Sequence, residues 1–448
     1  MISNVKYGRK VRWSRPGVNT GSFFGADFSV LCGSCNTASA PVSIVDGRAR
    51  DYALLAGSAK PCFDDYPMQS FSIFPFEPPG DIPALRHEVR AFIAAHMPKT
   101  RAASRANCWS VADAKFSRAM GEAGYIGMVW PKRYGGHERH PLERYTVLEE
   151  LLAAGAPVAM HWVADRQSGP LLLRYGSEEL CERIVPGIAR GESFFCIGMS
   201  EPGTGSDLAS VRTQGVRTKE GWRINGQKVW TSGAHYSQYM IALVRTQEGS
   251  ERHAGLTQFL IDMSSPGISV RPIIDLVGAH HFNEVFFDDV LVPDSMRLGA
   301  EGGGWAQVTA ELSLERSGPE RYLSSYALLV EFIRQAGPSP DAATRALIGQ
   351  FTAELWTLRQ MSRSTAAKLA AGQDPMLEAA VVKDLGNSFE QSLPRRILAG
   401  IGGLGALSDE SELMEVLALL LQISPSFSLR GGTREILRGI IARGLGLR

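Results

Sequence analysis

Two short polar segments of this 448-residue chain carry residues that could hold an aromatic cofactor. The first, residues 200–207, reads Ser-Glu-Pro-Gly-Thr-Gly-Ser-Asp and follows the apolar run 194–199. Its glycines let a ligand approach the backbone, and the Ser206 hydroxyl can bind an anion. The second, residues 230–233, reads Trp-Thr-Ser-Gly and offers an indole and hydroxyls to a ring system. Each segment also has an ordinary interpretation. The first could be a polar loop after a strand, and the second could end in a core tryptophan.

The elements that must position these segments change from helical to strand-like and back. From Asp81 to about Arg190 the chain reads as helices, with Asp81 as the first N-cap. Strands are predicted at 193–199, 211–217, 222–232, 239–245, 256–262, 268–274 and 282–290. Asn225-Gly226 predicts a hairpin turn within this region. Long helices are predicted at 320–336, 341–372, 375–400 and 409–423.

This order predicts an α+β fold whose helices and strands are segregated. We expect an N-terminal helical domain over 76–195, an antiparallel barrel or sandwich over 196–300, and a C-terminal helical domain over 301–448. Residues 1–75 do not fit this pattern, because residues 1–26 carry five basic side chains and no acidic one, and prolines follow. We interpret 1–75 as a disordered or wrongly included extension, or as a transit peptide.

Composition narrows the class of protein. A formal net charge of +1 argues against a nucleic-acid partner. The densest apolar run, 413–423, covers about half of the ~20 residues that a membrane span needs. Six scattered cysteines suit a reducing, intracellular protein, so we expect a cytoplasmic location, or the mitochondrial matrix in a eukaryote. Cys32 and Cys35 form an isolated Cys-x-x-Cys, which we interpret as coincidence, and no metal site is predicted.

Four motifs in order resemble the acyl-CoA dehydrogenase family over about residues 81–448. They are the Glu-Pro-x-x-Gly-Ser-Asp loop, the Lys-x-Trp segment ending at Trp230, the strand 282–290 leading into Val292-Pro293, and the terminal run 431–438. The resemblance implies a middle β-barrel, a C-terminal four-helix bundle and bound FAD. Residues implied to contact FAD are Ile197, Met199, Ser200, Trp230, Ser232, Thr433 and Glu435. Ser200 and Ser232 stand where relatives often have threonine, which keeps the hydroxyl.

The resemblance also implies the reaction and its base. An α-proton and a β-hydride leave an acyl-CoA thioester to give a trans-2-enoyl-CoA, with flavin N5 as hydride acceptor. Many relatives carry the base just before Gly-Thr, but this chain has Gly431 there. Another branch carries it on the first long C-terminal helix, where Glu315 aligns. Glu315 also adjoins the breaker Gly318-Pro319, which could open space beside it. A surface glutamate paired with Arg316 is the alternative.

The resemblance assigns substrate contacts to Ser206, Arg316, Arg430 and Gly431. Ser206 would meet the CoA phosphates, Arg316 would lie near the base, and the Gly431 N–H could donate to the thioester carbonyl. Relatives often have an aromatic residue at position 430, so Arg430 suggests a reshaped pocket for a bulky, branched or cyclic acyl group. Expected partners are an acceptor like electron-transfer flavoprotein and the other chains of a homotetramer or heterotetramer.

Two further patterns have ordinary explanations. Residues 400–405 match G-x-G-x-x-G, but a helical run precedes them, so a Rossmann site is not expected. The resemblance instead places Gly402 and Gly403 beside the FAD of a neighbouring subunit. His280 and His281 are expected in a loop, without a metal or acid–base role. Two other functions stay open: a non-catalytic subunit of a heteromeric dehydrogenase, and a flavin oxidase or monooxygenase on the same fold.

Overall fold

The computed structural model describes most of the chain after residue 70. It describes residues 71–447 except 78, 251, 317, 405–407 and 409–410. All of these belong to one compact unit, residues 62–448. Cys32, Cys35 and residues 1–70 of the expected extension lie outside the described residues.

Residues 71–77 precede the first helix and lie against helices that come much later in the chain. They have no regular secondary structure. The Ser72 N–H donates to Glu378 Oε1 (3.4 Å), and the Phe74 N–H donates to Ser364 Oγ (2.6 Å). Folded contacts therefore begin some ten residues before the first helix.

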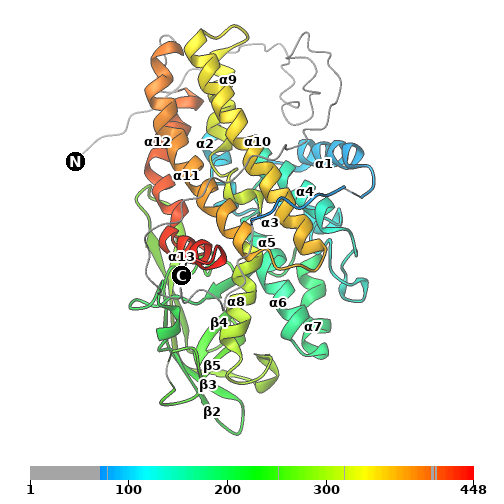
Figure 1. Cartoon of the computed structure of the whole chain (residues 1–448). Helices are drawn as coiled ribbons and strands as arrows, with labels where there is room; N and C mark the ends of the chain where they lie inside the picture. Colours follow the sequence, from blue (N-terminus) through cyan, green and yellow to red (C-terminus); the bar gives the residue numbers. More distant parts are fainter. Residues whose placement is uncertain are drawn as a thin grey trace, which may run out of the picture. The chain divides into compact units, whose positions relative to one another are not determined.

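Helices make up the N-terminal part of the described chain (Figure 1). In order they are α1 (Ile82–His96), α2 (Ala102–Arg105), α3 (Ala114–Glu122), α4 (Pro141–Ala154), α5 (Ala159–Val163), α6 (Gly169–Tyr175) and α7 (Glu178–Ala189). A π-helical segment, Ala164–Ser168, joins α5 to α6. The predicted N-cap is confirmed, because the Asp81 side chain accepts from the Ala84 N–H.

The middle of the chain forms one sheet. Its strands are β1 (Phe195–Gly198), β2 (Gln214–Arg217), β3 (Trp222–Lys228), β4 (Tyr239–Arg245), β5 (Leu256–Asp262), β6 (Ile268–Ile274), β7 (His280–Val292) and β8 (Arg297–Leu298). The strand order is β6-β7-β3-β2-β4-β5-β8, with β1 beside β4. All predicted strands overlap an observed one, and the α+β class is confirmed. The sheet is not purely antiparallel, since β1 and β2 each run parallel to β4.

The predicted hairpin turn at Asn225-Gly226 is wrong. β3 continues through both residues, and the chain turns earlier, where the Thr218 N–H donates to Gly221 O (2.7 Å). Gly226 has φ +149°, and the pairing of β3 with β7 changes register beside it. A Cβ at Gly226 would lie 2.7 Å from Thr213 Oγ1. The glycine therefore serves a bulge and a close approach within a strand.

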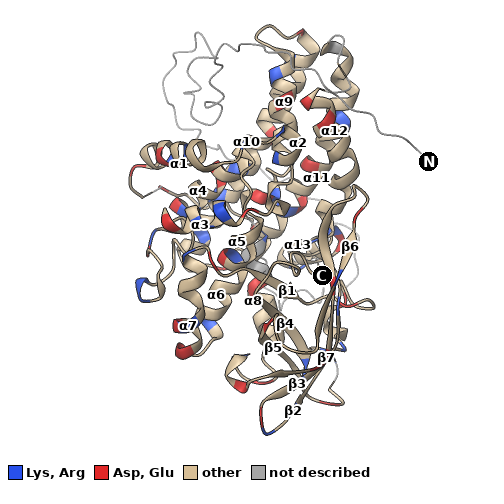
Figure 2. Cartoon of the chain, turned by 180° about the vertical axis from the view of Figure 1, so that it is seen from behind, with Lys and Arg blue, Asp and Glu red and all other residues tan. Residues whose placement is uncertain are grey.

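The C-terminal part is helical again. Its helices are α8 (Gly304–Glu315), α9 (Tyr326–Ala336), α10 (Ala342–Ala370), α11 (Met376–Gly400), α12 (Glu412–Ile423) and α13 (Arg434–Gly444). α11 packs against α10, α12 and α13, and α8 packs against β5. The helix predicted from 320 begins later, because Pro319–Arg321 forms a 3-10 turn, in which Glu320 is buried and pairs with Arg166. Figures 1 and 2 show the β6–β7 hairpin reaching up beside α13.

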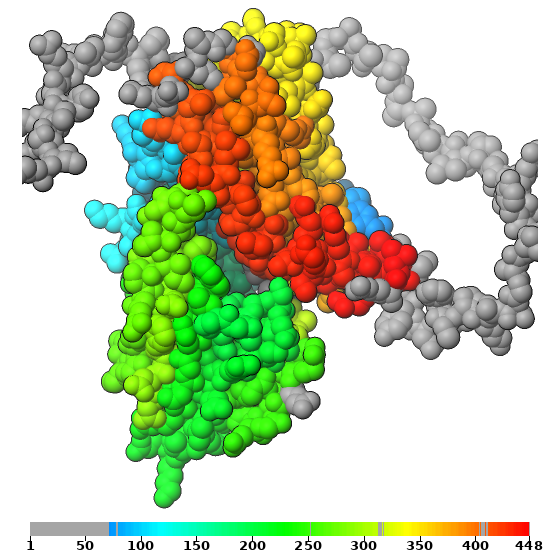
Figure 3. Space-filling model, turned by 90° about the vertical axis from the view of Figure 1, so that its left-hand side faces the viewer, coloured from blue at the N-terminus to red at the C-terminus, as the bar shows by residue number. Residues whose placement is uncertain are grey.

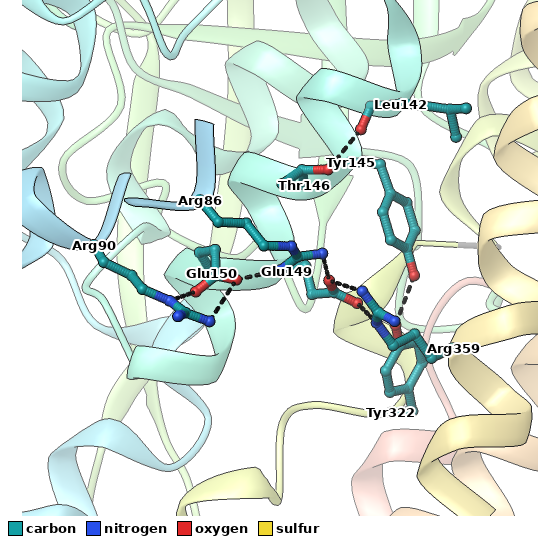
Figure 4. Close-up of polar contacts among 9 residues, drawn as sticks. All are labelled: Arg86, Arg90, Leu142, Tyr145, Thr146, Glu149, Glu150, Tyr322 and Arg359. Atoms are coloured by element: carbon teal, nitrogen blue, oxygen red, sulfur yellow. Dashed lines mark hydrogen bonds and ion pairs between the residues drawn. The ribbon is translucent and has the colours of Figure 1, made fainter. Parts of the chain in front are cut away.

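A buried polar cluster joins the N-terminal helices to the C-terminal ones (Figure 4). Glu149 on α4 accepts from Arg359 on α10 (2.6 and 3.0 Å) and from Arg86 on α1 (2.5 Å). Close by, the hydroxyls of Tyr145 and Tyr322 are 2.6 Å apart. Burial acts to raise the pKa of Glu149, but the two arginines hold it below its usual value. The cluster thus consists of paired charges.

The described residues contain neither a membrane-spanning helix nor a metal-binding cluster. No helix there is long and apolar enough to cross a bilayer. The apolar run 413–423 lies in α12, where Leu413, Val416, Leu417 and Leu420 are buried. Within the same part of the chain, no cluster of three or more His, Cys, Asp or Glu residues could hold a metal ion.

Candidate active site

A buried ion pair fixes the polar loop that follows β1. Lys228, the last residue of β3, is fully buried, and its Nζ donates to Glu201 Oε1 (2.8 Å), Leu243 O (2.7 Å) and Met199 O (3.1 Å). These bonds use all three ammonium protons. The pair therefore ties the start of the loop to β3 and β4. Both residues belong to the sequence motifs, but their spacing along the chain did not reveal that they touch.

Glu201 has further partners on the segment before β2. Its carboxylate accepts from the Arg212 N–H (2.7 Å), the Thr213 N–H (2.9 Å) and Thr213 Oγ1 (2.6 Å). Burial acts to raise the pKa of Glu201, but the charge of Lys228 and these hydrogen bonds hold it below its usual value. Burial lowers the pKa of Lys228 to about 8, which Glu201 opposes. Both groups are therefore charged at pH 7, and the loop is held rigidly.

The outer part of the same loop is open to a ligand. Gly203, Gly205 and Ser206 are exposed. A Cβ added at either glycine would meet no atom within 4 Å. At the base of the loop, the Val229 N–H donates to Ser200 O (2.9 Å), so residues 199–200 lie beside the segment that carries Trp230. The two segments singled out from the sequence are thus neighbours in space.

Trp230 lies just beyond β3 in an unusual backbone conformation. Its φ is +59°, which non-glycine residues rarely adopt, and 59% of the side chain is exposed. The indole packs edge-on against Phe282 at a centroid distance of 5.9 Å. The alternative of a core tryptophan is therefore wrong. Ser232, two residues later, is partly exposed, as are Ser200 in the neighbouring loop and Ile197 in β1.

The end of α8 meets the entry to α13. Arg316, directly after the last residue of α8, is buried, and its Nε donates to Gly431 O (3.3 Å). Glu315 is that last residue, so its backbone lies one residue from this contact, while its side chain lies outside the described part of the structure. Glu311, one turn earlier, is buried and accepts from Gln258 Nε2 (3.4 Å). Glu311 is thus engaged within the core beside β5.

The turn before α13 depends on two glycines. Gly431 has φ +64° and Gly432 has φ +97°, so side chains there would be strained. Lys383 of α11 donates from Nζ to Gly432 O (2.9 Å) and fixes the turn. Thr433 then caps α13 and accepts from the Ile436 N–H (3.5 Å), while Glu435 is exposed in the first helical turn. Figure 3 shows a hollow between the strands of the sheet and the helices that lead into α13.

Comparison with known proteins decides the family. Models of the acyl-CoA dehydrogenase N-terminal, middle and C-terminal domains match residues 81–192, 196–290 and 324–446. Acyl-CoA dehydrogenase IpdE1 of Mycobacterium tuberculosis is 36% identical over 342 residues, which cover 74% of this chain and 87% of that protein. Acyl-CoA dehydrogenase FadE29 of the same organism is 34% identical, covering 72% and 86%.

The chain belongs to the acyl-CoA dehydrogenase family. Solved structures agree with the sequence comparisons. The Tcur3481-Tcur3483 steroid ACAD matches with a TM-score of 0.72 at 27% identity, covering 83% of this chain and 99% of that one. The ChsE4-ChsE5 complex from Mycobacterium tuberculosis matches with a TM-score of 0.72 at 27% identity, covering 84% and 99%. The resemblance seen in the sequence and the class of enzyme, an FAD-dependent oxidoreductase, are confirmed.

The residues around Trp230 fit an isoalloxazine ring in this acyl-CoA dehydrogenase. A flat ring needs an apolar surface and nearby polar groups at its edge. The exposed indole offers the first, and the Ser200 and Ser232 hydroxyls with the 199–200 backbone offer the second. The rigid base under Met199 and Glu201 holds these groups in place before any ligand arrives.

Arg430 turns inward toward the N-terminal helices. Its guanidinium lies 3.4 Å from the ring centre of Trp109 and 4.6 Å from that of Phe427. Arg321 approaches Trp109 as well, at 5.9 Å. The dehydrogenase therefore carries a cation–aromatic cluster at the position where relatives often have an aromatic residue.

Gly402 and Gly403 are not brought to the other candidate residues within this chain. They form a 3-10 turn, Ile401–Leu404, directly after α11, and Gly402 is exposed. Asp384, which pairs with Arg434 at the start of α13, lies eighteen residues earlier on α11. At 1.5 Å per residue the two sites are about 25 Å apart along this helix. The helix before the glycines also argues against a Rossmann site.

The expectation of a loop role for the two histidines is wrong. His280 and His281 are the first two residues of β7. His280 stacks on His235 with ring centres 4.0 Å apart. Burial, reinforced by the charge of Arg430, lowers the pKa of His281 to about 4. Sequence reasoning also missed Asn283, three residues into β7, whose side chain donates to Thr231 O.

Proposed function

We propose that this chain oxidises an acyl-CoA thioester to a trans-2-enoyl-CoA with Glu315 as the base. The contact between Arg316 Nε and Gly431 O carries the proposal, because it joins the end of α8 to the turn before α13. A base at the end of α8 and an N–H at Gly431 would then face one thioester. The Glu315 carboxylate takes the Cα proton, which needs a base within hydrogen-bond reach.

The thioester carbonyl needs its own partner, because negative charge grows on its oxygen as the proton leaves. We assign this role to the Gly431 backbone N–H, held by the Lys383 contact to Gly432 O. The chemistry that FAD supplies when bound is acceptance of the hydride that leaves Cβ. Trp230, Ser200 and Ser232 would hold its ring, with Ile197 and Met199 beside it, and Thr433 and Glu435 would reach its adenosine half. Ser206 would contact the CoA phosphates.

The acyl group is proposed to be bulky or cyclic. Arg430 replaces a family aromatic residue and lies among Trp109 and Phe427, so the pocket differs from one built for a straight alkyl chain. The name of one structural relative, a steroid ACAD, fits a ring-bearing substrate. Reduced enzyme would pass its electrons to an acceptor like electron-transfer flavoprotein.

Assembly with further chains is part of the proposal. Gly402 and Gly403 lie about 25 Å along α11 from Asp384, which pairs with Arg434 at the start of α13, so we assign them to the flavin of a neighbouring chain. A relative that forms a complex of two different chains, ChsE4-ChsE5, makes a heteromer as reasonable as a homotetramer. In that setting the chain could also be the non-catalytic member.

The test is an anaerobic half-reaction. Flavin-loaded protein is mixed with straight-chain, branched and ring-bearing acyl-CoA thioesters, and the flavin absorbance is followed. We expect bleaching by wild type, and a loss of about 10²–10⁴-fold in rate for Glu315→Gln, since that is the usual contribution of a general base. Glu311→Gln, one turn earlier and beside Gln258, is the matched control and should bleach.

Each outcome separates two readings. Bleaching by both variants would place the base elsewhere. No bleaching by flavin-loaded wild type with any thioester would favour the non-catalytic subunit. Peroxide formed in air during turnover would favour an oxidase.

A further inference from the structure

Asn283 in β7 hydrogen-bonds the segment that carries Trp230 and Ser232. It is fully buried. Its backbone O accepts from the Thr231 N–H (3.0 Å), and its side-chain Nδ2 donates to Thr231 O (3.0 Å). One residue thus binds both backbone groups of Thr231, the residue between the two proposed flavin contacts. The Gly233 N–H, which donates to His281 O (3.0 Å), extends the attachment.

Two histidines orient the Asn283 amide. Nδ2 lies 3.1 Å from His235 Nδ1, and Oδ1 lies 2.8 Å from His280 Nε2. Because Nδ2 can only donate, His235 Nδ1 must accept, and because Oδ1 can only accept, His280 Nε2 must donate. The amide has two protons, and both are used. The stack of His235 on His280 holds the two rings together at 4.0 Å.

The histidines reach the segment from the side opposite to Trp230. Successive side chains of a strand point to opposite faces, so Asn283 faces away from Phe282, on which Trp230 packs. On the Asn283 side lies an open groove of about 610 Å³, lined by His235, His280 and Asn283 together with residues of β4 to β6. The support for this segment therefore lies on the face opposite to Phe282 and Trp230.

We propose that Asn283, oriented by His235 and His280, is a positioning residue that sets the geometry of Trp230–Ser232 for flavin binding. The proposal rests on the flavin site of the proposed function. Trp230 needs such a support because its φ of +59° is unfavourable for a residue with a side chain. Without the amide, the Thr231 carbonyl loses a buried partner and the segment can relax toward an ordinary conformation.

The experiment measures FAD binding and the flavin absorbance spectrum of apoprotein reconstituted with FAD. Asn283→Asp keeps the shape but puts an acceptor against Thr231 O, and Asn283→Ala removes the amide. We expect FAD Kd to rise about tenfold or more in both, with a shifted flavin band, because a buried group is left unpaired. His280→Phe, at an exposed position, keeps the stack on His235 and should raise Kd about threefold, which provides the test if the Asn283 variants do not fold.

Two controls separate the possible failures. Asn225→Ala removes a bond to the Asp289 N–H (2.8 Å) at the other end of the same strand pair, and should leave Kd within twofold of wild type. Trp230→Leu should weaken FAD binding if the proposed flavin site is right. Normal Kd in folded Asn283 and His280 variants, with weak binding by Trp230→Leu, overturns this inference alone. Normal binding by Trp230→Leu overturns the flavin site itself.

Discussion

Single buried charges decide much of the local geometry near the candidate site. Lys228 is an example, because its three donated bonds hold Met199, Glu201 and Leu243 at fixed places. A buried lysine is costly unless every proton finds an acceptor. Here the Glu201 carboxylate accepts from Lys228 and also from Arg212 and Thr213, so the buried ammonium is paired. The ion pair therefore anchors the loop that follows β1.

Glu390 on α11 is a buried carboxyl of a different kind. Its Oε1 accepts from the Ser324 N–H (2.6 Å). Burial raises the pKa of Glu390 to about 7, even though the positive charge of Arg430 and the Ser324 hydrogen bonds oppose the shift. The group therefore holds its proton in the folded protein at a pH where the unfolded chain has lost it.

This gives a prediction about stability and pH. Between the unfolded pKa of 4.5 and the folded value of about 7, the folded state binds more protons, so the free energy of unfolding falls as pH rises. Glu390→Gln stays neutral at every pH. Its free energy of unfolding, relative to that of wild type, should therefore rise by about 2–3 kcal/mol between pH 5 and pH 8. Denaturant unfolding at both pH values measures it. Glu182→Gln, at an exposed glutamate on α7, should show no such change, and an equal change in both variants would refute the assignment to Glu390.

At the scale of elements, the packing of α11 depends on its close approach to the backbone of the 3-10 turn 319–321. Gly386 in this helix faces the 3-10 turn before α9, and a Cβ there would lie 2.2 Å from the backbone O of Arg321. That turn carries Glu320, which pairs with Arg166 of the π-helical segment at 2.6 Å. π-helical segments are frequent at functional sites, and this one directs Arg166 toward the stretch that follows Glu315.

Two glycine-to-alanine changes should therefore have opposite signs. Gly349 in α10 is exposed and a Cβ there meets nothing within 4 Å, so Gly349→Ala should stabilise the protein by about 0.5–1 kcal/mol through helix propensity. Gly386→Ala gains the same propensity but clashes with backbone, and should destabilise by about 2–4 kcal/mol. Thermal unfolding of the two variants beside wild type measures the difference. Stabilisation by both would show that α11 can move away from the turn at little cost.

At the scale of the whole described body, a charged cluster joins helices that are far apart in sequence. Arg359 on α10 and Arg86 on α1 share Glu149 on α4 (Figure 4). Glu149 is nearly inaccessible to solvent, so its partners decide whether it stays ionised. The cluster couples the N-terminal helices to the C-terminal ones.

Removal of one partner from this cluster should strongly destabilise the folded protein. Arg359→Met leaves Glu149 buried with Arg86 alone, and we expect a loss of about 3–5 kcal/mol in the free energy of unfolding. We also expect a broader transition, because the helices at either end of the cluster would unfold less cooperatively. Denaturant unfolding followed by far-ultraviolet circular dichroism measures both. Arg345→Met, at an exposed arginine on the same helix, is the control and should change stability by less than about 0.5 kcal/mol. A similar effect of both variants would contradict a special role for the cluster.

Residue patterns alone predicted most elements and the family. The N-cap at Asp81, the strands of the sheet and the long helices α10, α11 and α12 follow from local rules of capping and periodicity, which depend on neighbours in sequence. The four ordered motifs sufficed to recognise an acyl-CoA dehydrogenase and its FAD. Among the local signals that failed was Asn225-Gly226, because a glycine that permits a turn also permits a bulge.

Tertiary structure decided which of those residues touch. Nothing in the spacing of Lys228 and Glu201, Arg316 and Gly431, or Asn283 and Thr231 predicts a contact, since each pair is separated by tens of residues or more. Their meeting depends on how the sheet and helices pack, and on the need of every buried polar group for a partner. The sequence determined the chemistry that the residues can perform, and the packing of distant elements determined which of them are held together to perform it.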